Sequence, residues 1–346
     1  MIKPRTDKID ELKEMSNNNS RLIVLNQEFK YIYILIENNE IIRFLVEDIK
    51  NVSLGDIYCA KIASVNKSVG GCFSYIINKT EGFIADVNPE DIILLNRKYD
   101  GVLKQGDELF VKIIKESYGK KAAVCKPLKS DEIAEFYKDT KKYSSPSLIK
   151  KTSSVLEEII EEYSGNEDFN VIITDEKIKE KLKPVCEKYA VDLKLHLNED
   201  IPLRTVYGLK SKFERITEEK VWLKNGGYLF INKTEAMTVI DVNSGKIIAK
   251  DKEQGMYVTC MDAAKEIAYQ IGVRNISGII IVDMLKIKDP DNKTKLINYM
   301  NDVLGALNPP AKLVDITKLG LFEITRQKKY PDIYTQLSKI NKTILL

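Results

Sequence analysis

Short apolar runs separated by turn residues fill the first third of the chain. Two β-rich runs, residues 21–37 and 40–48, flank Asn38-Asn39, and a paired asparagine at such a place favours a hairpin turn. Several more strand-like runs lie between residues 52 and 129, with glycines between them and no helical period. Short strands at this spacing predict a small β-barrel, and the OB-fold is the common barrel that binds single-stranded nucleic acid.

Helical and strand-like patterns alternate in the rest of the chain. An amphipathic segment predicts a helix from Leu148, and a strand, a helix and a strand are predicted in turn over residues 169–197. Gly226-Gly227 predicts a turn between two further strands. In residues 256–271 the apolar side chains recur at steps of four and three, which predicts a helix whose buried stripe is Tyr257, Met261, Ala264, Ala268 and Ile271.

Two aspartates end short β-branched runs. Asp241 follows Thr238-Val239-Ile240, and Asp283 follows Ile279-Ile280-Ile281-Val282. Buried strands would deliver both carboxylates to the edge of a sheet, and magnesium accepts one or two carboxylates while water and a phosphate complete its shell. For either aspartate alone, a helix cap or a closed turn fits equally well.

Polar residues just beyond Asp241 add to this candidate metal site. Asn243 lies two positions further and shares the face of Asp241 if the strand continues, so its amide could reach a phosphate or a metal-bound water. Lys246 could contact a phosphate. The segment is not a nucleotide-binding phosphate loop, because positions 240 and 247 are both Ile where that motif needs Gly and Ser or Thr.

Composition indicates a soluble globular protein with room for two or three domains. The 346 residues are 44% hydrophobic and 30% charged, and their net charge of +3 is too small to identify a polyanion-binding protein. No apolar run could span a bilayer and residues 1–19 have no signal-peptide core, so we expect a cytoplasmic protein without a membrane partner. Five well-separated cysteines predict free buried thiols.

Four segments of the sequence carry a family resemblance. EAMTVIDVNSGK, AAKEIAYQIGVRN, SGIIIVD and LGLFEITRQ occur in the order and approximate spacing of the catalytic region of the ribonuclease E/G family. The chain resembles that family from about Arg21 to about Lys329. The resemblance implies a magnesium-dependent endoribonuclease that hydrolyses single-stranded RNA to 5′-phosphate and 3′-hydroxyl ends in RNA processing or decay. The alternative is an RNA-binding protein of the same family with weak or no activity.

The histidine content agrees with a metal-dependent reaction. Cleavage through the 2′-hydroxyl without a metal commonly uses two histidines as acid and base, and this chain has only His196, in a strand-like run. Metal-assisted hydrolysis needs carboxylates, a cation and water. We therefore expect Mg²⁺ as the cofactor, held by Asp241 and Asp283.

The resemblance also implies a mixed α/β multidomain fold. In it, an RNase H-like subdomain carries an inserted OB-fold barrel and is followed by a DNase I-like catalytic subdomain. The expected boundaries are 1–19 for an N-terminal extension, 20–51 and 131–212 for the two parts of the RNase H-like subdomain, 52–130 for the RNA-binding barrel and 213–346 for the catalytic subdomain.

Further site residues follow from family position. Asp241, Asp283 and Asn243 match the catalytic motif. Phe73 and Phe83 fall where the family places exposed aromatics that stack on bases, although core packing is the alternative for any phenylalanine in a strand. The lysines of the family's basic loop near the substrate correspond to Lys115, Lys120 and Lys121, for which a solvated cluster is the alternative.

Two departures from the family pattern stand out. Residues 129–147 leave no room for the subdomain, marked by Arg-Thr-Ala, that senses a 5′-monophosphate, so we expect a compact member that is indifferent to the 5′ end of RNA. The cysteine pair that links family subunits through zinc has no counterpart. A homodimer is compatible with this pattern and a zinc-linked tetramer is not expected.

Overall fold

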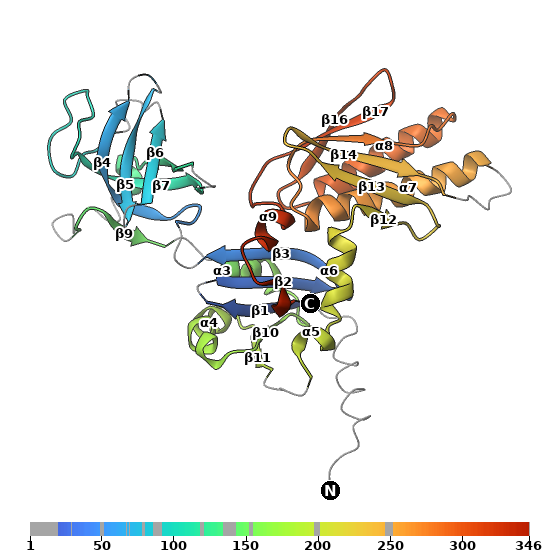
Figure 1. The fold of residues 1–346 in the computed structure, drawn as a ribbon, viewed down its shortest axis with the longest axis horizontal. Helices are drawn as coiled ribbons and strands as arrows, with labels where there is room; N and C mark the ends of the chain where they lie inside the picture. The colour runs from blue at the N-terminus through green and yellow to red at the C-terminus, as the bar shows by residue number, and fades with distance from the viewer. Residues whose placement is uncertain are drawn as a thin grey trace, which may run out of the picture. The chain divides into compact units, whose positions relative to one another are not determined.

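The chain forms two compact units in the computed structural model (Figure 1). The first unit combines residues 1–49 with 159–346, and the second unit covers residues 50–158. The structure describes residues 20–28, 30–48, 52–66, 68, 70–77, 80–85, 92–117, 121–133, 143–151, 155–196, 201–245 and 252–345. The expected N-terminal extension, residues 1–19, lies outside these ranges.

A five-stranded sheet in the first unit has the order β11-β10-β1-β2-β3. Strands β1, β2 and β3 are antiparallel, whereas β10 and β11 run parallel to β1. Asn38 and Asn39 both have positive φ, 48° and 64°, which confirms the predicted hairpin turn. The run 21–37 is two strands rather than one, because the chain turns back at Glu28. The strands are β1 (Arg21–Gln27), β2 (Lys30–Glu37), β3 (Glu40–Asp48), β10 (Asn170–Ile173) and β11 (Asp192–Leu195).

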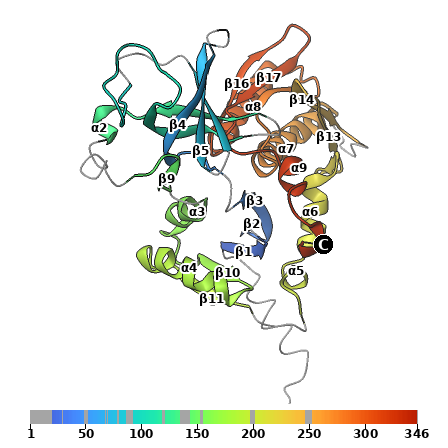
Figure 2. The same ribbon diagram turned by 60° about the vertical axis from the view of Figure 1, so that its left-hand side comes forward.

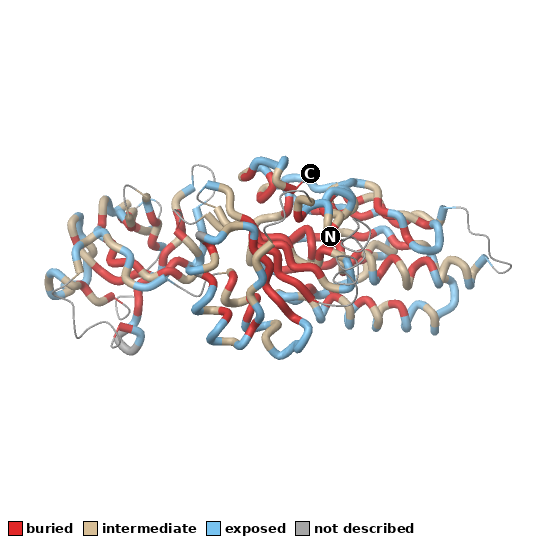
Figure 3. Tube along the Cα trace, turned by 90° about the horizontal axis from the view of Figure 1, so that it is seen from below, coloured by how far each residue is buried: buried red, intermediate tan, exposed pale blue. Residues whose placement is uncertain are grey.

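Helices cover this sheet and complete its core. Phe44 of β3 meets Phe213 of α6 edge to face with ring centroids 5.1 Å apart, and Leu337 of α9 joins the same buried cluster. Figure 3 shows buried residues gathered along the strands and exposed ones along the outer helix surfaces. The helices are α3 (Val155–Tyr163), α4 (Glu176–Lys188), α5 (Leu203–Val206), α6 (Leu209–Thr217), α9 (Ile333–Leu337) and the 3-10 helix η3 (Lys342–Ile344).

A second, six-stranded sheet in the first unit has the order β12-β13-β14-β15-β17-β16. Only β14 and β15 pair in parallel, and helix α7 connects them. The predicted Gly226-Gly227 turn lies between β12 and β13. The elements are β12 (Lys220–Trp222), β13 (Tyr228–Lys233), β14 (Met237–Asn243), α7 (Lys252–Val273), β15 (Gly278–Asp283), α8 (Pro290–Gly305), β16 (Ala311–Ile316) and β17 (Leu321–Arg326).

One face of the six-stranded sheet is buried and the other is open. Ile240, Val242, Ile280 and Val282 form a single core cluster with apolar residues of α7 and α8. The ribbon in Figure 2 shows α7 and α8 beside the strands of this sheet. The predicted stripe of α7 contributes Ala264, Ala268 and Ile271 to the buried set, while Tyr257 and Met261 lie at its margin. Alternate residues on β14 are buried and exposed, so every second side chain reaches the open face.

The second unit contains the predicted barrel. Its strands close in the order β4-β5-β6-β8-β7-β4, with β6 and β8 parallel and all other pairs antiparallel. A closed five-stranded barrel of this kind is OB-like. The strands are β4 (Ile57–Asn66), β5 (Gly71–Ile77), β6 (Thr80–Ala85), β7 (Glu108–Lys115) and β8 (Ala123–Pro127), followed by the short helix α2 (Ser130–Ile133).

The predicted helix start at Leu148 is wrong. Residues Ser147–Lys150 instead form strand β9, which pairs with the beginning of β4 so that Lys150 is the partner of Ile57. Ile149 packs against the small cluster around Phe110, and β4 offers a free hydrogen-bonding edge there. Helix α3 is formed by Val155–Tyr163, the later part of the amphipathic segment.

All five cysteines are buried and free of disulfides, as their spacing predicts. Burial raises the pKa of the Cys125 thiol to about 12, so this side chain remains protonated at neutral pH. Among the described residues, no helix combines the length and the apolar composition needed to cross a membrane.

Arg326 is a buried cation that joins several loops of the first unit. It is 5% exposed, and its guanidinium donates to the carbonyl oxygens of Ile271 (3.0 Å), Ile276 (3.1 Å), Asn308 (3.1 Å) and Pro309 (2.9 Å). These donors satisfy backbone acceptors where α7 and α8 end. The side chain therefore fixes both helix ends to the end of strand β17.

Replacing Arg326 with Met should destabilise the first unit. The carbonyl groups of Ile276, Asn308 and Pro309 would lose the donors that Arg326 supplies, whereas the Ile271 carbonyl would keep the backbone amide of Ile276. A buried acceptor without a partner costs about 1–3 kcal/mol. We expect the free energy of unfolding to fall by at least about 3 kcal/mol. Urea unfolding followed by the emission of Trp222, the one tryptophan of the chain, reports on this unit. Lys312→Met on exposed β16 is the control, and equal stability of both variants would contradict the role of Arg326.

Candidate active site

The two predicted aspartates lie side by side on the open face of the six-stranded sheet. Strands β14 and β15 pair in parallel with Asp241 directly opposite Asp283. Neighbouring strands are about 4.8 Å apart, and directly paired residues project on the same face. Both aspartates are exposed, whereas Ile240 and Val282 beside them are buried. The geometry therefore presents two adjacent carboxylates to solvent.

Asn243 completes the polar group at this strand end. It lies two residues beyond Asp241 on the same face, and its Nδ2 donates to Oδ2 of Asp241 at 2.7 Å. This hydrogen bond limits the rotation of the Asp241 carboxylate. The predicted proximity of Asn243 to the aspartate pair is thus present in the structure.

The turn that follows keeps the backbone close to this site. Gly245 has a φ of 59°, and a Cβ at this position would collide with the backbone oxygen of Gly226. Glycine is therefore required where the end of β14 passes the β12–β13 turn. Lys246, the next predicted contact, lies outside the described residues.

A metal ion at this strand end would have few protein ligands. Within the described ranges, no three His, Cys, Asp or Glu side chains gather as a metal-binding group. Mg²⁺ suits such a site because it is often held by one or two carboxylates and retains several waters. The oxygen-only donor set of Asp241 and Asp283 fits that ion, whereas zinc and copper prefer nitrogen and sulfur ligands.

The barrel carries a second candidate surface on its outer side. Phe73 of β5 and Phe83 of β6 are direct partners across the two strands, and their ring centroids are 5.2 Å apart. Both rings are half-buried and neither belongs to the barrel's buried core. A Cβ on Gly71 would come within 2.6 Å of the Phe83 ring, so that ring occupies the space beside the glycine.

Lysines lie near this aromatic pair. Lys115 pairs with Val124 of β8, and Val124 in turn pairs with Phe83, which places all three in one row across the barrel. Lys115 and Lys121 are exposed. Lys120 lies outside the described residues.

The sequence patterns did not reveal one aromatic side chain of this surface. Tyr75 is 43% exposed and projects on the same face of β5 as Phe73. Its position two residues after Phe73 is the local signal that identifies it.

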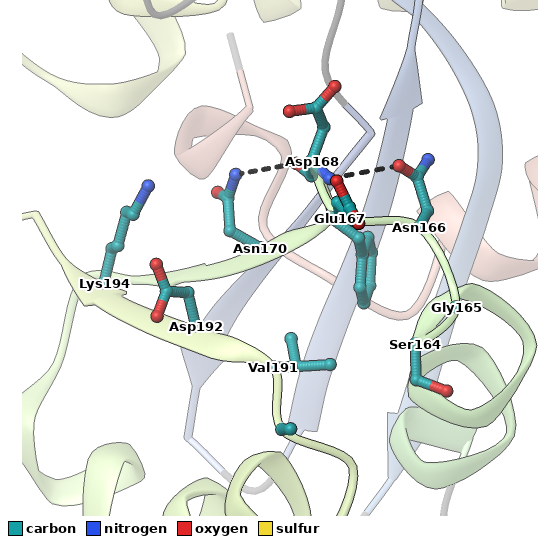
Figure 4. Close-up of a pocket in the computed structure, with 11 residues that line it drawn as sticks. Ser164, Gly165, Asn166, Glu167, Asp168, Asn170, Val191, Asp192 and Lys194 are labelled. Carbon is teal, nitrogen blue, oxygen red and sulfur yellow. Dashed lines mark hydrogen bonds between the residues drawn. The ribbon is translucent and has the colours of Figure 1, made fainter.

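A polar cavity elsewhere in the first unit contains none of the predicted residues. It has a volume of about 510 Å³ and is lined by residues 164–170, which lead into β10, and by residues 190–192 and 194 at the start of β11. Figure 4 shows Asn170 donating to the Asp168 carbonyl and the Asp168 amide donating to Asn166. The lining of this cavity has three acidic side chains and a single lysine, and this balance of charge disfavours the binding of a polyanion there.

Comparisons with known proteins identify relatives of this chain. A sequence profile of the Ribonuclease E/G family matches residues 128–329. The chain is 30% identical over 203 residues to a Ribonuclease E/G-like protein of Pyropia yezoensis, which covers 56% of this chain and 40% of that protein. It is also 29% identical over 191 residues to Ribonuclease G of Haemophilus influenzae, and this match covers 54% of the present chain and 39% of that protein.

A third relative, Ribonuclease E of a Nostoc species, is 26% identical over 201 residues, covering 55% of this chain and 29% of that protein. The matches thus span less than half the length of each of these relatives. The profile match nevertheless covers more than half of this chain and includes both strands of the aspartate pair. The chain belongs to the ribonuclease E/G family.

Proposed function

We propose that this chain is a magnesium-dependent endoribonuclease that hydrolyses single-stranded RNA and leaves 5′-phosphate and 3′-hydroxyl ends. The observation that carries the proposal is the direct pairing of Asp241 with Asp283 on adjacent parallel strands, with both carboxylates exposed. Its membership of a family whose named relatives are ribonucleases supports RNA as the substrate.

Asp241 and Asp283 would hold the ion. When bound, Mg²⁺ activates a water nucleophile and neutralises charge on the phosphoryl oxygens. Without a cation, two carboxylates one strand spacing apart would repel both each other and an incoming phosphate. An exposed acidic pair on the open face of the sheet is therefore better explained as a metal site than as a site that contacts RNA directly.

Asn243 would act as a positioning residue. Its amide donates to Asp241, so the Asp241 carboxylate keeps one orientation before substrate arrives. Hydrogen bonds that orient a ligand in this way commonly matter almost as much as the ligand itself. Lys246 would assist by contacting a phosphate.

A metal-free reaction through the 2′-hydroxyl has less support. His196 is the chain's one histidine, and its Nε2 lies 3.1 Å from the carbonyl oxygen of Ile201. It therefore has a local structural partner and no second histidine with which to share acid and base roles.

The barrel would bind the RNA strand through Phe73 and Phe83. Unpaired bases stack on aromatic faces without much sequence preference, and Lys115, Lys120 and Lys121 would attract the phosphates. In this interpretation the five-stranded sheet is the RNase H-like part and the six-stranded sheet the DNase I-like part. The protein would act in the cytoplasm in RNA processing or decay, and a homodimer is compatible with the proposal.

Asp241→Asn and Asp283→Asn should abolish cleavage while RNA binding persists. Each change removes one charge from the proposed metal site and leaves the barrel unaltered. The loss in rate should exceed the roughly 10–100-fold typical of an outer-shell change. Cleavage of an unstructured A/U-rich oligoribonucleotide with Mg²⁺ measures it, and EDTA should mimic both variants. Asp302→Asn on the exposed side of α8 is the control; undiminished cleavage by both site variants would refute the assignment.

Asn243→Ala should lower the cleavage rate by roughly 10–100-fold through weaker metal binding. Because the carboxylates remain, added Mg²⁺ should restore part of the activity. Rates measured over a range of Mg²⁺ concentrations test this. A rate loss that no Mg²⁺ concentration relieves would instead assign Asn243 a direct contact with the phosphate.

Phe73→Ala and Phe83→Ala should each weaken binding of single-stranded RNA by about 1–3 kcal/mol. If the rings were core, each truncation would instead cost about 3–5 kcal/mol of stability. Binding titrations beside thermal melts of the same variants separate the two effects. Val102→Ala, an exposed apolar position of the barrel unit, is the control. A large fall in melting temperature with unchanged affinity would show that the pair serves packing.

A further inference from the structure

A partly exposed aromatic cluster lies on the same open face as the aspartate pair. Trp222 of β12 meets Tyr228 of β13 with ring centroids 5.4 Å apart, and Tyr228 meets Phe230 at 5.6 Å. Trp222 is 61% exposed. The cluster does not belong to the sheet's core, which uses the alternate residues Val221 and Leu229 on the opposite face.

The strand register connects this cluster directly to the carboxylates. Phe230 is the partner of Asp241, and Tyr228 is the partner of Asn243. Trp222 in turn pairs with Tyr228 on the far side. Since direct partners share a face, the aromatic rings begin one strand spacing, about 4.8 Å, from the site and continue to the next strand.

A cation accompanies the rings. The Nζ atom of Lys220 lies 4.0 Å from the ring centroid of Trp222 and 4.1 Å from that of Tyr228. Lys220 also pairs with Phe230, in the row that contains both aspartates. The lysine ammonium lies over the two rings, so positive charge and aromatic surface occur together, and this is the combination with which proteins bind single-stranded nucleic acid.

From these contacts we infer that Trp222, Tyr228 and Lys220 form a base-stacking subsite for the nucleotides next to the phosphate that is cut. The inference rests on the proposed function and adds a substrate requirement to it. A ribose separates a base from its phosphate by a distance similar to one strand spacing, so a phosphate at Asp241 places an adjacent base over β13 and β12. Only unpaired bases expose the faces that such stacking needs, and the subsite therefore selects single-stranded RNA at the cutting site.

Three further features of the cluster agree with single-stranded RNA as its ligand. Trp222 is 61% exposed and contributes nothing to the buried core of the sheet. Lys220 adds charge that would favour a polyanion over an apolar protein partner. The registers of β12 with β13, β13 with β14 and β14 with β15 connect the rings to the carboxylate pair without a gap. They would therefore set the position of the RNA relative to the rings.

The fluorescence of Trp222 gives a direct test, because the chain contains no other tryptophan. A full-length Asp241→Asn variant, which should not cut, is titrated with a short oligouridylate while tryptophan emission is recorded. We expect saturable quenching as a base stacks on the indole. An abasic oligomer of the same length and an RNA duplex should bind with much less quenching.

Variants at Trp222 then test the contribution of its aromatic ring. In the same background, Trp222→Ala should weaken oligouridylate binding roughly five-fold or more, and Trp222→Phe should largely restore it. Val314→Ala, an exposed position on β16 of the same sheet, should have no effect. In the active chain, Trp222→Ala should raise KM more than it lowers kcat, since it removes binding and leaves the metal site intact.

Two results would overturn the inference. One is unchanged Trp222 emission while anisotropy of a labelled RNA shows that the chain binds it. The other is emission that shifts with protein concentration and not with RNA, which would assign the face to self-association. Cleavage by the wild-type chain is assayed in parallel, so that failure of the proposed nuclease activity and failure of the stacking subsite remain distinguishable.

Discussion

The parallel pairing of β14 with β15 is the constraint on which the candidate site depends. A slip of one residue between these strands would turn one aspartate into the core, and a slip of two would separate the carboxylates along the strands. The register is held from the other face, where Ile240, Val242, Ile280 and Val282 are packed under α7 and α8. Antiparallel neighbours, β13 and β17, fix the pair from both sides. Packing on the buried face of the sheet thus positions the two carboxylates on its open face.

This division also explains how the sheet tolerates a destabilising arrangement. Two carboxylates about 5 Å apart repel by about 1 kcal/mol in water and by more where solvent is partly excluded. Because Asp241 and Asp283 are both exposed, solvent keeps that repulsion small in the absence of a cation. On the same face, Trp222 is 61% exposed and Tyr228 is half-buried. Both features are unfavourable in the isolated chain and are reasonable where a ligand covers them.

Local patterns predicted the parts of the fold that local physics determines. Asn38-Asn39 set a hairpin because both residues accept positive φ, and the four-and-three spacing in α7 identified its buried side. The aspartate pair was predicted because each residue ends a β-branched run, although its register was not visible in sequence. Pairing between distant segments could not be predicted. The sequence from Leu148 has a helical pattern, yet its first residues pair with a strand some ninety positions earlier. Likewise, the rings of Trp222 and Tyr228 become neighbours only through the β12–β13 register.

Strand β9 also affects how this discontinuous protein can fold. The first unit is interrupted in sequence by the barrel unit, and its parallel pair β1 and β10 lies on opposite sides of that interruption. Because Ile57 at the start of β4 is hydrogen-bonded opposite Lys150 at the end of β9, a folded barrel brings its own two ends together. When the strands of the first unit pair, the loop that must be closed is then effectively short. Without the folded barrel, that loop would consist of about a hundred flexible residues. Each halving of a loop saves about 0.6 kcal/mol of closure entropy, so roughly four halvings amount to about 2.4 kcal/mol. A barrel that folds early therefore lowers the entropic cost of pairing β1 with β10. The four residues of β9 produce this effect, because their pairing with β4 holds the two ends of the barrel together.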